Sequence, residues 1–195
     1  MSQLLVEGAK SVNMYLPNTE WWHFKNRESH LETVSGNYLN EAEIDDTPLH
    51  VRGGCIIPTE DYNMANSNKV QPKNITLYVF PLKDVASGEI YVDDLNSINP
   101  IETKKYARYS IDYKNCTIKF KKVEPEGSQR FDWFVTNVHV FKAKEVKKLE
   151  IPGQSLLQFM MNYVTHVLTI TANMPLDHLI YIKWYDDNEK CSMLP

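Results

Sequence analysis

The chain has 195 residues, of which 43% are hydrophobic, and its formal net charge at pH 7 is −4. Such a chain can bury a sizeable core, so we expect a folded protein with one large domain or two small ones. Lysine and arginine are scattered apart from a short run at residues 142–148, which argues against nucleic acid binding because that requires a continuous basic face. No segment has the length of a membrane span, and residues 1–10 lack the basic flank and apolar core of a signal peptide.

The first informative segment, residues 12–24, reads VNMYLPNTEWWHF and contains two adjacent tryptophans. Adjacent side chains on a strand point to opposite faces, so we expect one of Trp21 and Trp22 to face inward and the other outward. The outward ring is a candidate contact for a sugar or a partner protein. The alternative is that both rings lie in the core or at a seam between domains, since tryptophan is highly buried on average.

Residues 47–58, TPLHVRGGCIIP, combine two short apolar runs with a pair of glycines and a closing proline. Leu49 and Val51 alternate with polar neighbours as in a half-buried strand. The glycines allow backbone angles or close approaches that a Cβ would block, and the proline is expected to end the second run. We therefore predict a bent or bulged strand with the structural motif Arg52, Gly53, Gly54 and Pro58. Arg52 is either an anchor between domains through its guanidinium group or a simple exposed arginine.

A polar stretch follows and is the best domain boundary in the chain. We take residues 1–60 as a first domain, residues 61–73 as a linker and residues 74–195 as a second domain. Period-2 alternation dominates, with predicted strands at residues 76–81, 88–93, 107–111, 116–120, 131–141, 156–163, 166–171 and 179–185. Short strands separated by turn residues predict an all-β protein with two antiparallel β-sandwich units.

Two sequons, Asn74-Ile-Thr and Asn115-Cys-Thr, make Asn74 and Asn115 candidate N-glycosylation sites.

The acidic pairs at residues 45–46, 93–94 and 186–187 are expected to have a structural role and not a catalytic one. Adjacent carboxylates on a strand point to opposite faces and could not both grip one sugar, so we expect these pairs in loops or turns. The loop at residues 93–97 is a weak calcium candidate, because its ligand spacing is incomplete.

Three cysteines, Cys55, Cys116 and Cys191, leave at least one thiol unpaired and have no zinc-site spacing. The six histidines are dispersed, so we predict neither a metal site nor a cofactor. Cys55 and Cys116 lie in predicted strands, where a small buried hydrophobic residue is expected in preference to a reactive thiol. The sequence does not decide whether two of these cysteines form a disulfide.

Several apolar side chains in the second domain are expected in its core. Trp133 lies between Phe131 and Val135 at period 2, and Trp184 shares its parity with Ile180 and Ile182. The cluster of Phe159, Met160 and Met161 is expected to fill the core, although methionine-rich surfaces also serve adaptable binding.

Three segments in this order resemble the region that follows the catalytic barrel in family 31 glycoside hydrolases, the α-glucosidases. Residues 12–24 resemble a Y-x-P-x-x-x-W-Y stretch, residues 47–58 a post-barrel hallmark, and residues 87–99, SGEIYVDDLNSIN, a G-x-L-x-W-D-D-G-x-S-x-D hairpin. The chain departs from the last pattern at Val92, Leu95 and Asn99. The resemblance implies a proximal β-sandwich followed by a distal one, and a secreted or endomembrane location.

This chain is too short to contain the catalytic barrel of those enzymes. A (β/α)8 barrel occupies at least about 200 residues, and retaining hydrolysis needs two carboxyl groups about 5 Å apart. The catalytic signatures of the family, an Asp before Met-Asn-Glu and an Arg-Trp-x-Gly-Asp, are also absent from the sequence. We therefore assign no catalytic residue and predict a non-catalytic C-terminal region that supports a barrel absent from this chain.

The resemblance implies two partners: the catalytic barrel of a parent glucosidase, or a second copy that covers the former barrel-facing surface. The alternative function is a stand-alone interaction module that binds a glycan or a protein partner. A new enzyme built on the sandwich is the weakest hypothesis, because no nucleophile, base and orienting group appear together.

Overall fold

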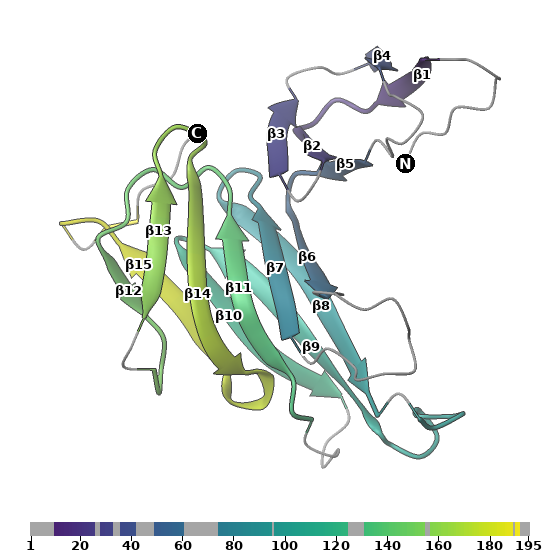
Figure 1. Ribbon diagram of the computed structural model, residues 1–195, viewed down its shortest axis with the longest axis vertical. Coiled ribbons are helices and arrows are strands. Elements are labelled where there is room, and N and C mark those ends of the chain that lie inside the picture. The colour runs from purple at the N-terminus through teal and green to yellow at the C-terminus, as the bar shows by residue number, and fades with distance from the viewer. Residues whose placement is uncertain are drawn as a thin grey trace. The chain divides into compact units, whose positions relative to one another are not determined.

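The computed structural model (Figure 1) describes residues 10–25, 28–32, 36–41, 49–60, 74–94, 96–124, 131–154, 157–188 and 190–191. The chain forms two compact units, Met1–Cys55 and Ile56–Pro195. Within the described ranges the structure consists of strands and one three-residue 3₁₀ helix, η1 (Leu176–His178). No helix of these residues is long and apolar enough to cross a bilayer.

The described residues of the first unit form two small antiparallel sheets. β1 (Ser11–Leu16) pairs with β4 (Gly36–Glu41), and β2 (Trp21–Lys25) lies between β3 (Glu28–Glu32) and β5 (Leu49–Arg52). Trp22 lies opposite Val51 across β2 and β5, and it is buried, as is Leu16. A unit of this size buries little apolar surface, so its stability depends on few core side chains.

The second unit is built on one ten-stranded sheet in the order β12-β15-β10-β9-β8-β6-β7-β11-β14-β13. Its strands are β6 (Cys55–Glu60), β7 (Asn74–Phe80), β8 (Val85–Asp93), β9 (Tyr106–Lys114), β10 (Thr117–Glu124), β11 (Phe134–Val140), β12 (Lys148–Glu150), β13 (Gln158–Asn162), β14 (Val167–Pro175) and β15 (Tyr181–Tyr185). β7 and β11 run parallel, whereas β8–β9, β9–β10, β10–β15, β12–β15, β11–β14 and β13–β14 are antiparallel pairs.

The long sheet folds over on itself to make a sandwich. In Figure 1, β7, β11 and β14 lie in front of β9, β10 and β15. Buried side chains from both layers, such as Val138 of β11 and Ile118 of β10, belong to one continuous core. The inward side chains of each layer thus cover those of the other, as in a β-sandwich.

Alternation along the strands explains how β9 and β10 contribute to this core. Ala107, Tyr109, Ile111 and Tyr113 are buried on β9, and the residues between them face outward or are half-buried. The two strands are joined at Asn115 and Cys116, whose φ angles are 49° and 52°. Two consecutive positive φ values are typical of the type I′ turn, whose twist matches that of a hairpin.

Gly88 of β8 is required by a close approach of two strands. A Cβ at this position would lie 2.3 Å from the backbone oxygen of Ile56 on the neighbouring strand β6. A side chain is therefore excluded here by sterics.

The predicted all-β fold without a (β/α)8 barrel is confirmed, with the addition of the parallel pair β7–β11, which the sequence did not indicate. The predicted linker, residues 61–73, lies outside the described residues, and the domain bounds of 1–60 and 74–195 stay a prediction. β6, at the end of the first of these ranges, is part of the ten-stranded sheet.

Several predictions about single residues have clear outcomes. Trp133 and Trp184 are buried in the core, as predicted. The expectation that Phe159 and Met160 fill the core is wrong, because β13 is an edge strand and these side chains are 36% and 65% exposed. Met161 does pack against the core. Pro58 does not end its strand, since β6 continues to Glu60.

Candidate functional site

The motif at residues 52–58 is not one bent strand: Gly53 and Gly54 form a turn between β5 and β6, and Pro58 lies within β6. Arg52 ends β5 and is exposed, Gly53 donates its N–H to the backbone oxygen of Glu20 at 2.9 Å, and Gly54 has a φ of +89°. A positive φ of this size favours glycine. The role of Arg52 as an anchor between domains stays a prediction.

The two adjacent tryptophans have different environments. Trp22 is buried, whereas Trp21 is half-buried and its Nε1 donates to the backbone oxygen of Pro17 at 2.9 Å. The ring of Trp21 is thus held in place by its own indole N–H. A ligand or partner contact by Trp21 or Trp22 stays a prediction.

The two candidate glycosylation residues are both exposed and lie at different places in the second unit. Asn74 begins β7, and Asn115 lies in the turn between β9 and β10. The next residue of the second sequon, Cys116, forms a disulfide with Cys191, with the two Cα atoms 5.4 Å apart. Cys116 is buried, and its sulfur is bonded to that of Cys191. Cys55 is the free thiol among the described cysteines.

One member of each acidic pair that the structure describes stabilises a turn, whereas Asp93, which was expected in a loop, ends β8. Asp94 accepts hydrogen bonds from the backbone N–H and the hydroxyl group of Ser97, at 3.0 and 2.7 Å. Asp186 accepts the N–H groups of Asn188 and Lys190. Residues 45–46 lie outside the described residues. In the described ranges no three His, Cys, Asp or Glu side chains gather as a metal site would need.

Asp177 of the second unit has partners on three different segments. It accepts hydrogen bonds from the hydroxyl group of Tyr109 and the N–H of Phe131, and its carboxylate lies 3.4 Å from Nζ of Lys122. Burial acts to raise the pKa of Asp177, but these hydrogen bonds and the lysine charge together lower it. The carboxylate therefore joins η1 to β9 and β10 as a structural group.

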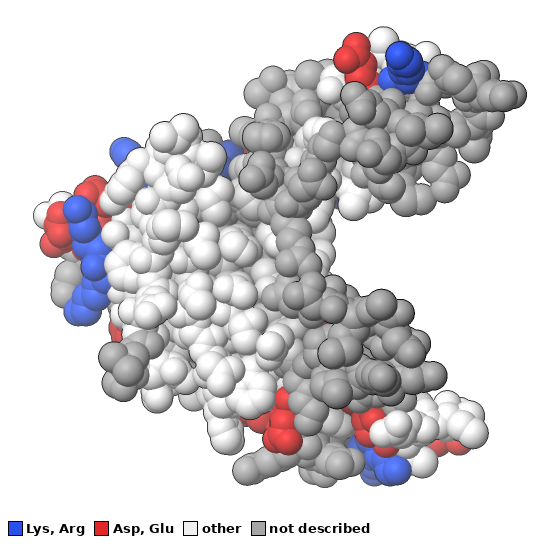
Figure 2. Space-filling view, in the orientation of Figure 1, with Lys and Arg blue, Asp and Glu red and all other residues white. Residues whose placement is uncertain are grey.

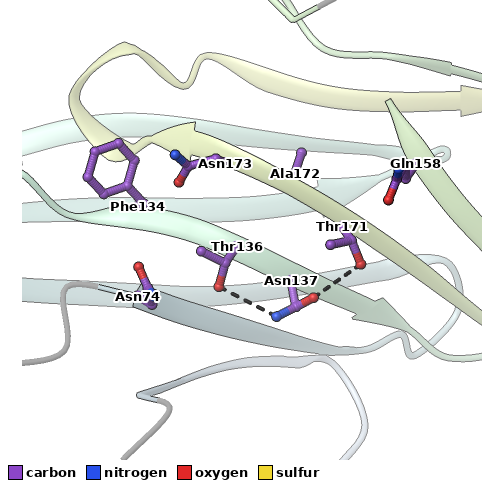
Figure 3. A pocket seen from close by; sticks show the side chains of 8 residues that line it. All are labelled: Asn74, Phe134, Thr136, Asn137, Gln158, Thr171, Ala172 and Asn173. Atoms are coloured by element: carbon purple, nitrogen blue, oxygen red, sulfur yellow. Dashed lines mark hydrogen bonds between the residues drawn. The ribbon is translucent and has the colours of Figure 1, made fainter. Parts of the chain in front are cut away.

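An open groove with a volume of about 610 Å³ lies on the second unit (Figure 3). Its walls come from β7, β11, β13 and β14, through Asn74, Phe134, Thr136, Asn137, Gln158, Thr171, Ala172 and Asn173. In Figure 3, Phe134 and Gln158 lie at opposite ends of the groove. Its volume falls within the range of about 300–1,000 Å³ that is common for small-molecule sites.

A β-bulge in β11 explains why this groove is polar. The pairing register shifts between Val135 and Asn137 on both sides of the strand: Thr136 is an extra residue relative to β7, and two residues of β14, Ala172 and Asn173, match this one residue of β11. Val135 and Val138 are both fully buried, whereas Thr136 and Asn137 between them both line the groove. The bulge thus turns two consecutive polar side chains to one face, a known use of bulges at functional sites.

Hydrogen bonds order the middle of the groove. Thr171 donates its hydroxyl group to Oδ1 of Asn137 at 3.2 Å, and Nδ2 of Asn137 lies 3.5 Å from Oγ1 of Thr136. Thr136 in turn donates to the backbone oxygen of Ile75. Three further amides, those of Asn74, Gln158 and Asn173, belong to exposed residues around this chain of hydrogen bonds.

The four strands that carry the groove contain no formal charge, although the neighbouring strand β6 ends at Glu60. β7, β11, β13 and β14 contain no Asp, Glu, Lys or Arg, whereas β8, β9, β10, β12 and β15 each contain at least one. Figure 2 shows the consequence as a broad white surface over β11, β13 and β14. A charged ligand finds no counter-charge on these four strands.

The sequence analysis named Asn74 among the groove residues, but for another reason. The other side chains come from three later strands, so no local motif unites them. Two signals were readable: the absence of charge in these strands and the three-residue step between Val135 and Val138, which departs from period 2.

Comparisons with known proteins identify the region. Residues 1–57 match the model of the glycosyl hydrolase family 31 C-terminal domain. Over these residues the chain is similar to the C-terminal domain of glycosyl hydrolase family 31. Intestinal sucrase-isomaltase of Rattus norvegicus is 26% identical over 210 residues, which cover 100% of this chain and 11% of the rat protein. The region therefore spans about a tenth of the length of that relative.

Solved structures share the fold of this chain. A glucosidase II alpha subunit matches 93% of the chain with a TM-score of 0.72 at 17% identity, and the match covers 22% of that subunit. A family 31 dextranase of Flavobacterium johnsoniae matches 92% of the chain with a TM-score of 0.70 at 20% identity, over 25% of the dextranase.

Proposed function

We propose that the chain is the non-catalytic C-terminal region of an α-glucosidase-like protein and that it supports a catalytic barrel which the chain itself does not contain. The observation that carries this proposal is the extent of the match. Similarity to rat sucrase-isomaltase runs through the whole chain but accounts for 11% of that protein. A share of this size suits a supporting region of a larger enzyme.

The carboxylates of the second unit favour the same role. Retaining glycoside hydrolysis needs two carboxyl groups about 5 Å apart on either side of the bond. Asp177 is instead engaged by Tyr109 and Lys122, and Asp94 by the residues of its own loop. These groups stabilise the sandwich, and their partners leave them poorly placed to act as nucleophile or acid.

The first unit offers a surface for the barrel. Tyr15 and Leu39 are 67% and 55% exposed, and the register of β1 with β4 places Tyr15 opposite Asn37 and Leu39 opposite Asn13. Residues two apart on a strand share a face, so Tyr15 and Leu39 lie on one face of this small sheet. Two large exposed apolar side chains together mark a candidate contact with another protein surface.

A hydrolysis assay tests the proposal that the chain is not itself an enzyme. The purified chain is incubated with maltose and with p-nitrophenyl α-glucoside, beside an intact family 31 glucosidase as positive control. We expect no release of glucose or nitrophenol above buffer. Turnover that follows the chain through successive purification steps would overturn the proposal.

A further inference from the structure

We propose that the groove lined by Phe134, Asn137 and Gln158 binds a neutral sugar residue. This site lies on the second unit and does not depend on the support role proposed above. Its ligand class follows from the chemistry of the lining side chains and from the charge of the strands that carry them.

The lining excludes charged ligands and purely apolar ones. The four strands that carry it contain no Asp, Glu, Lys or Arg, so an ion would lose its hydration without gaining a counter-charge. An apolar ligand would cover four carboxamides and two hydroxyl groups, and the loss of their water would oppose binding. The remaining class is uncharged and rich in hydrogen-bonding groups.

A pyranose fits this description because it has hydroxyl groups around its edge and an apolar face of C–H bonds. Each carboxamide of the groove presents both donors and an acceptor, which suits a hydroxyl group that also does both. Phe134 provides the apolar surface, and its half-buried ring lies at one end of the groove (Figure 3). The hydrogen bonds among Thr136, Asn137 and Thr171 hold the polar floor in position before binding.

The sugar can come from two sources. One is a free oligosaccharide. The other is a glycan attached to Asn74, whose sequon begins β7 and whose partner in the parallel register is Phe134 itself. A glycan on Asn74 would start beside the aromatic ring, so the same chemistry would hold its first residues against the sheet.

The first arm of the test uses the full chain made in bacteria, without glycans. Maltotriose and N,N′-diacetylchitobiose are titrated while the side-chain amide signals of Asn74, Asn137, Gln158 and Asn173 are followed by NMR. We expect these signals to shift with a dissociation constant of about 1 mM, as suits an open site. Phe134→Leu and Gln158→Ala should each weaken binding about tenfold.

The matched control is Phe159→Ala, an exposed aromatic side chain on β13 that does not line the groove. It should leave the affinity within a factor of about two. Gln158 is exposed, so its substitution keeps the test valid even if Phe134→Leu lowers stability.

The second arm uses the chain secreted by a eukaryotic host, with site occupancy measured by mass spectrometry. We expect a peptide N-glycosidase to release the glycan of Asn74 from the folded protein more slowly than that of Asn115, and Phe134→Leu to remove the difference. A positive result in either arm supports the proposal and identifies the source of the sugar.

The proposal is overturned if neither arm responds, or if the shifts persist unchanged in both groove variants. It is also overturned if a blocked Gly-Gly peptide shifts the amide signals and the sugars do not, because the groove would then bind extended peptide.

Discussion

Tyr113 stacks on Trp184 with ring centroids 5.8 Å apart and planes inclined by 7°. The same tyrosine donates its hydroxyl group to Oδ1 of Asp84 at 2.7 Å. One side chain of β9 therefore connects the core at β15 with the turn that precedes β8. Trp184 reports on this contact by its fluorescence.

Tyr113 makes the stability of the fold sensitive to alkaline pH. Burial, together with the hydrogen bond to Asp84 and its negative charge, raises the pKa of Tyr113 above the ordinary value of about 10. The unfolded chain ionises first, so the stabilisation is complete below pH 10 or so and is lost as the pH rises further. Tyr113→Phe should cost about 1 kcal/mol at pH 7 and should lose less stability above pH 10 than wild type.

Urea unfolding followed by tryptophan fluorescence at pH 7, 9 and 10.5 measures this effect. Tyr163→Phe is the control, since Tyr163 is 57% exposed. An alkaline loss that is the same in Tyr113→Phe and wild type would contradict the assignment.

Gly88→Ala should be strongly destabilising, because the new Cβ would meet the backbone oxygen of Ile56 at 2.3 Å. We expect a loss of at least about 2 kcal/mol in the free energy of unfolding. Gly153→Ala is the matched control: Gly153 has a φ of +77° and open space around it, so only backbone strain of about 1 kcal/mol is expected. Equal losses for the two variants would show that the strand approach at Gly88 is looser than described.

Cys191→Ser should destabilise the second unit by about 2–5 kcal/mol, because the disulfide with Cys116 closes a long loop of chain. Cys191 is the better position to change, since it is exposed and Cys116 is buried. The urea midpoint of this variant should equal that of reduced wild type. Cys55→Ser serves as control, and a midpoint that dithiothreitol leaves unchanged in wild type would argue against the disulfide.

Asp177→Asn should lower stability by about 1–3 kcal/mol at pH 7, because the contacts to Tyr109, Lys122 and Phe131 favour the charged carboxylate. The pKa of Asp177 is lowered in the fold, so its stabilisation is present above the ordinary value of about 3.9 and is lost as the pH falls below it. The stabilities of wild type and variant should converge below pH 4 or so. The control Asp187→Asn, at a 72% exposed side chain, should change the stability at pH 7 by less than about 0.5 kcal/mol.

Local sequence patterns predicted the strands of the second unit well, but they did not predict which distant strands pair with each other. The alternation in β9 and β10 predicts which face is buried, since the period of a strand is a local property. The parallel pairing of β7 with β11 depends on how distant segments meet, and the fully buried run of β7 gives no period to read. Likewise, three cysteines allow three pairings, and the sequence did not decide among them.

The burial of an apolar side chain depends on its place in the sheet as well as on its type. Met160 has the composition of a core residue, but its strand β13 lies at the sheet edge and leaves it exposed. The groove was not predicted from the sequence for a similar reason. Its residues come from four strands, and the bulge at Thr136 brings consecutive side chains to one face.

Complementation in trans tests the proposed support role most directly. A family 31 glucosidase truncated before its own C-terminal region is co-expressed with this chain, and its recovered activity is measured. The proposed support role predicts co-purification and recovered activity with the wild-type chain. The double variant Tyr15→Ser/Leu39→Ser should lower the recovered activity at least about fivefold. The control Ile98→Ser, a change at a 98% exposed loop residue, should not lower it. Equal activity with and without the chain, with no complex formed, would contradict it.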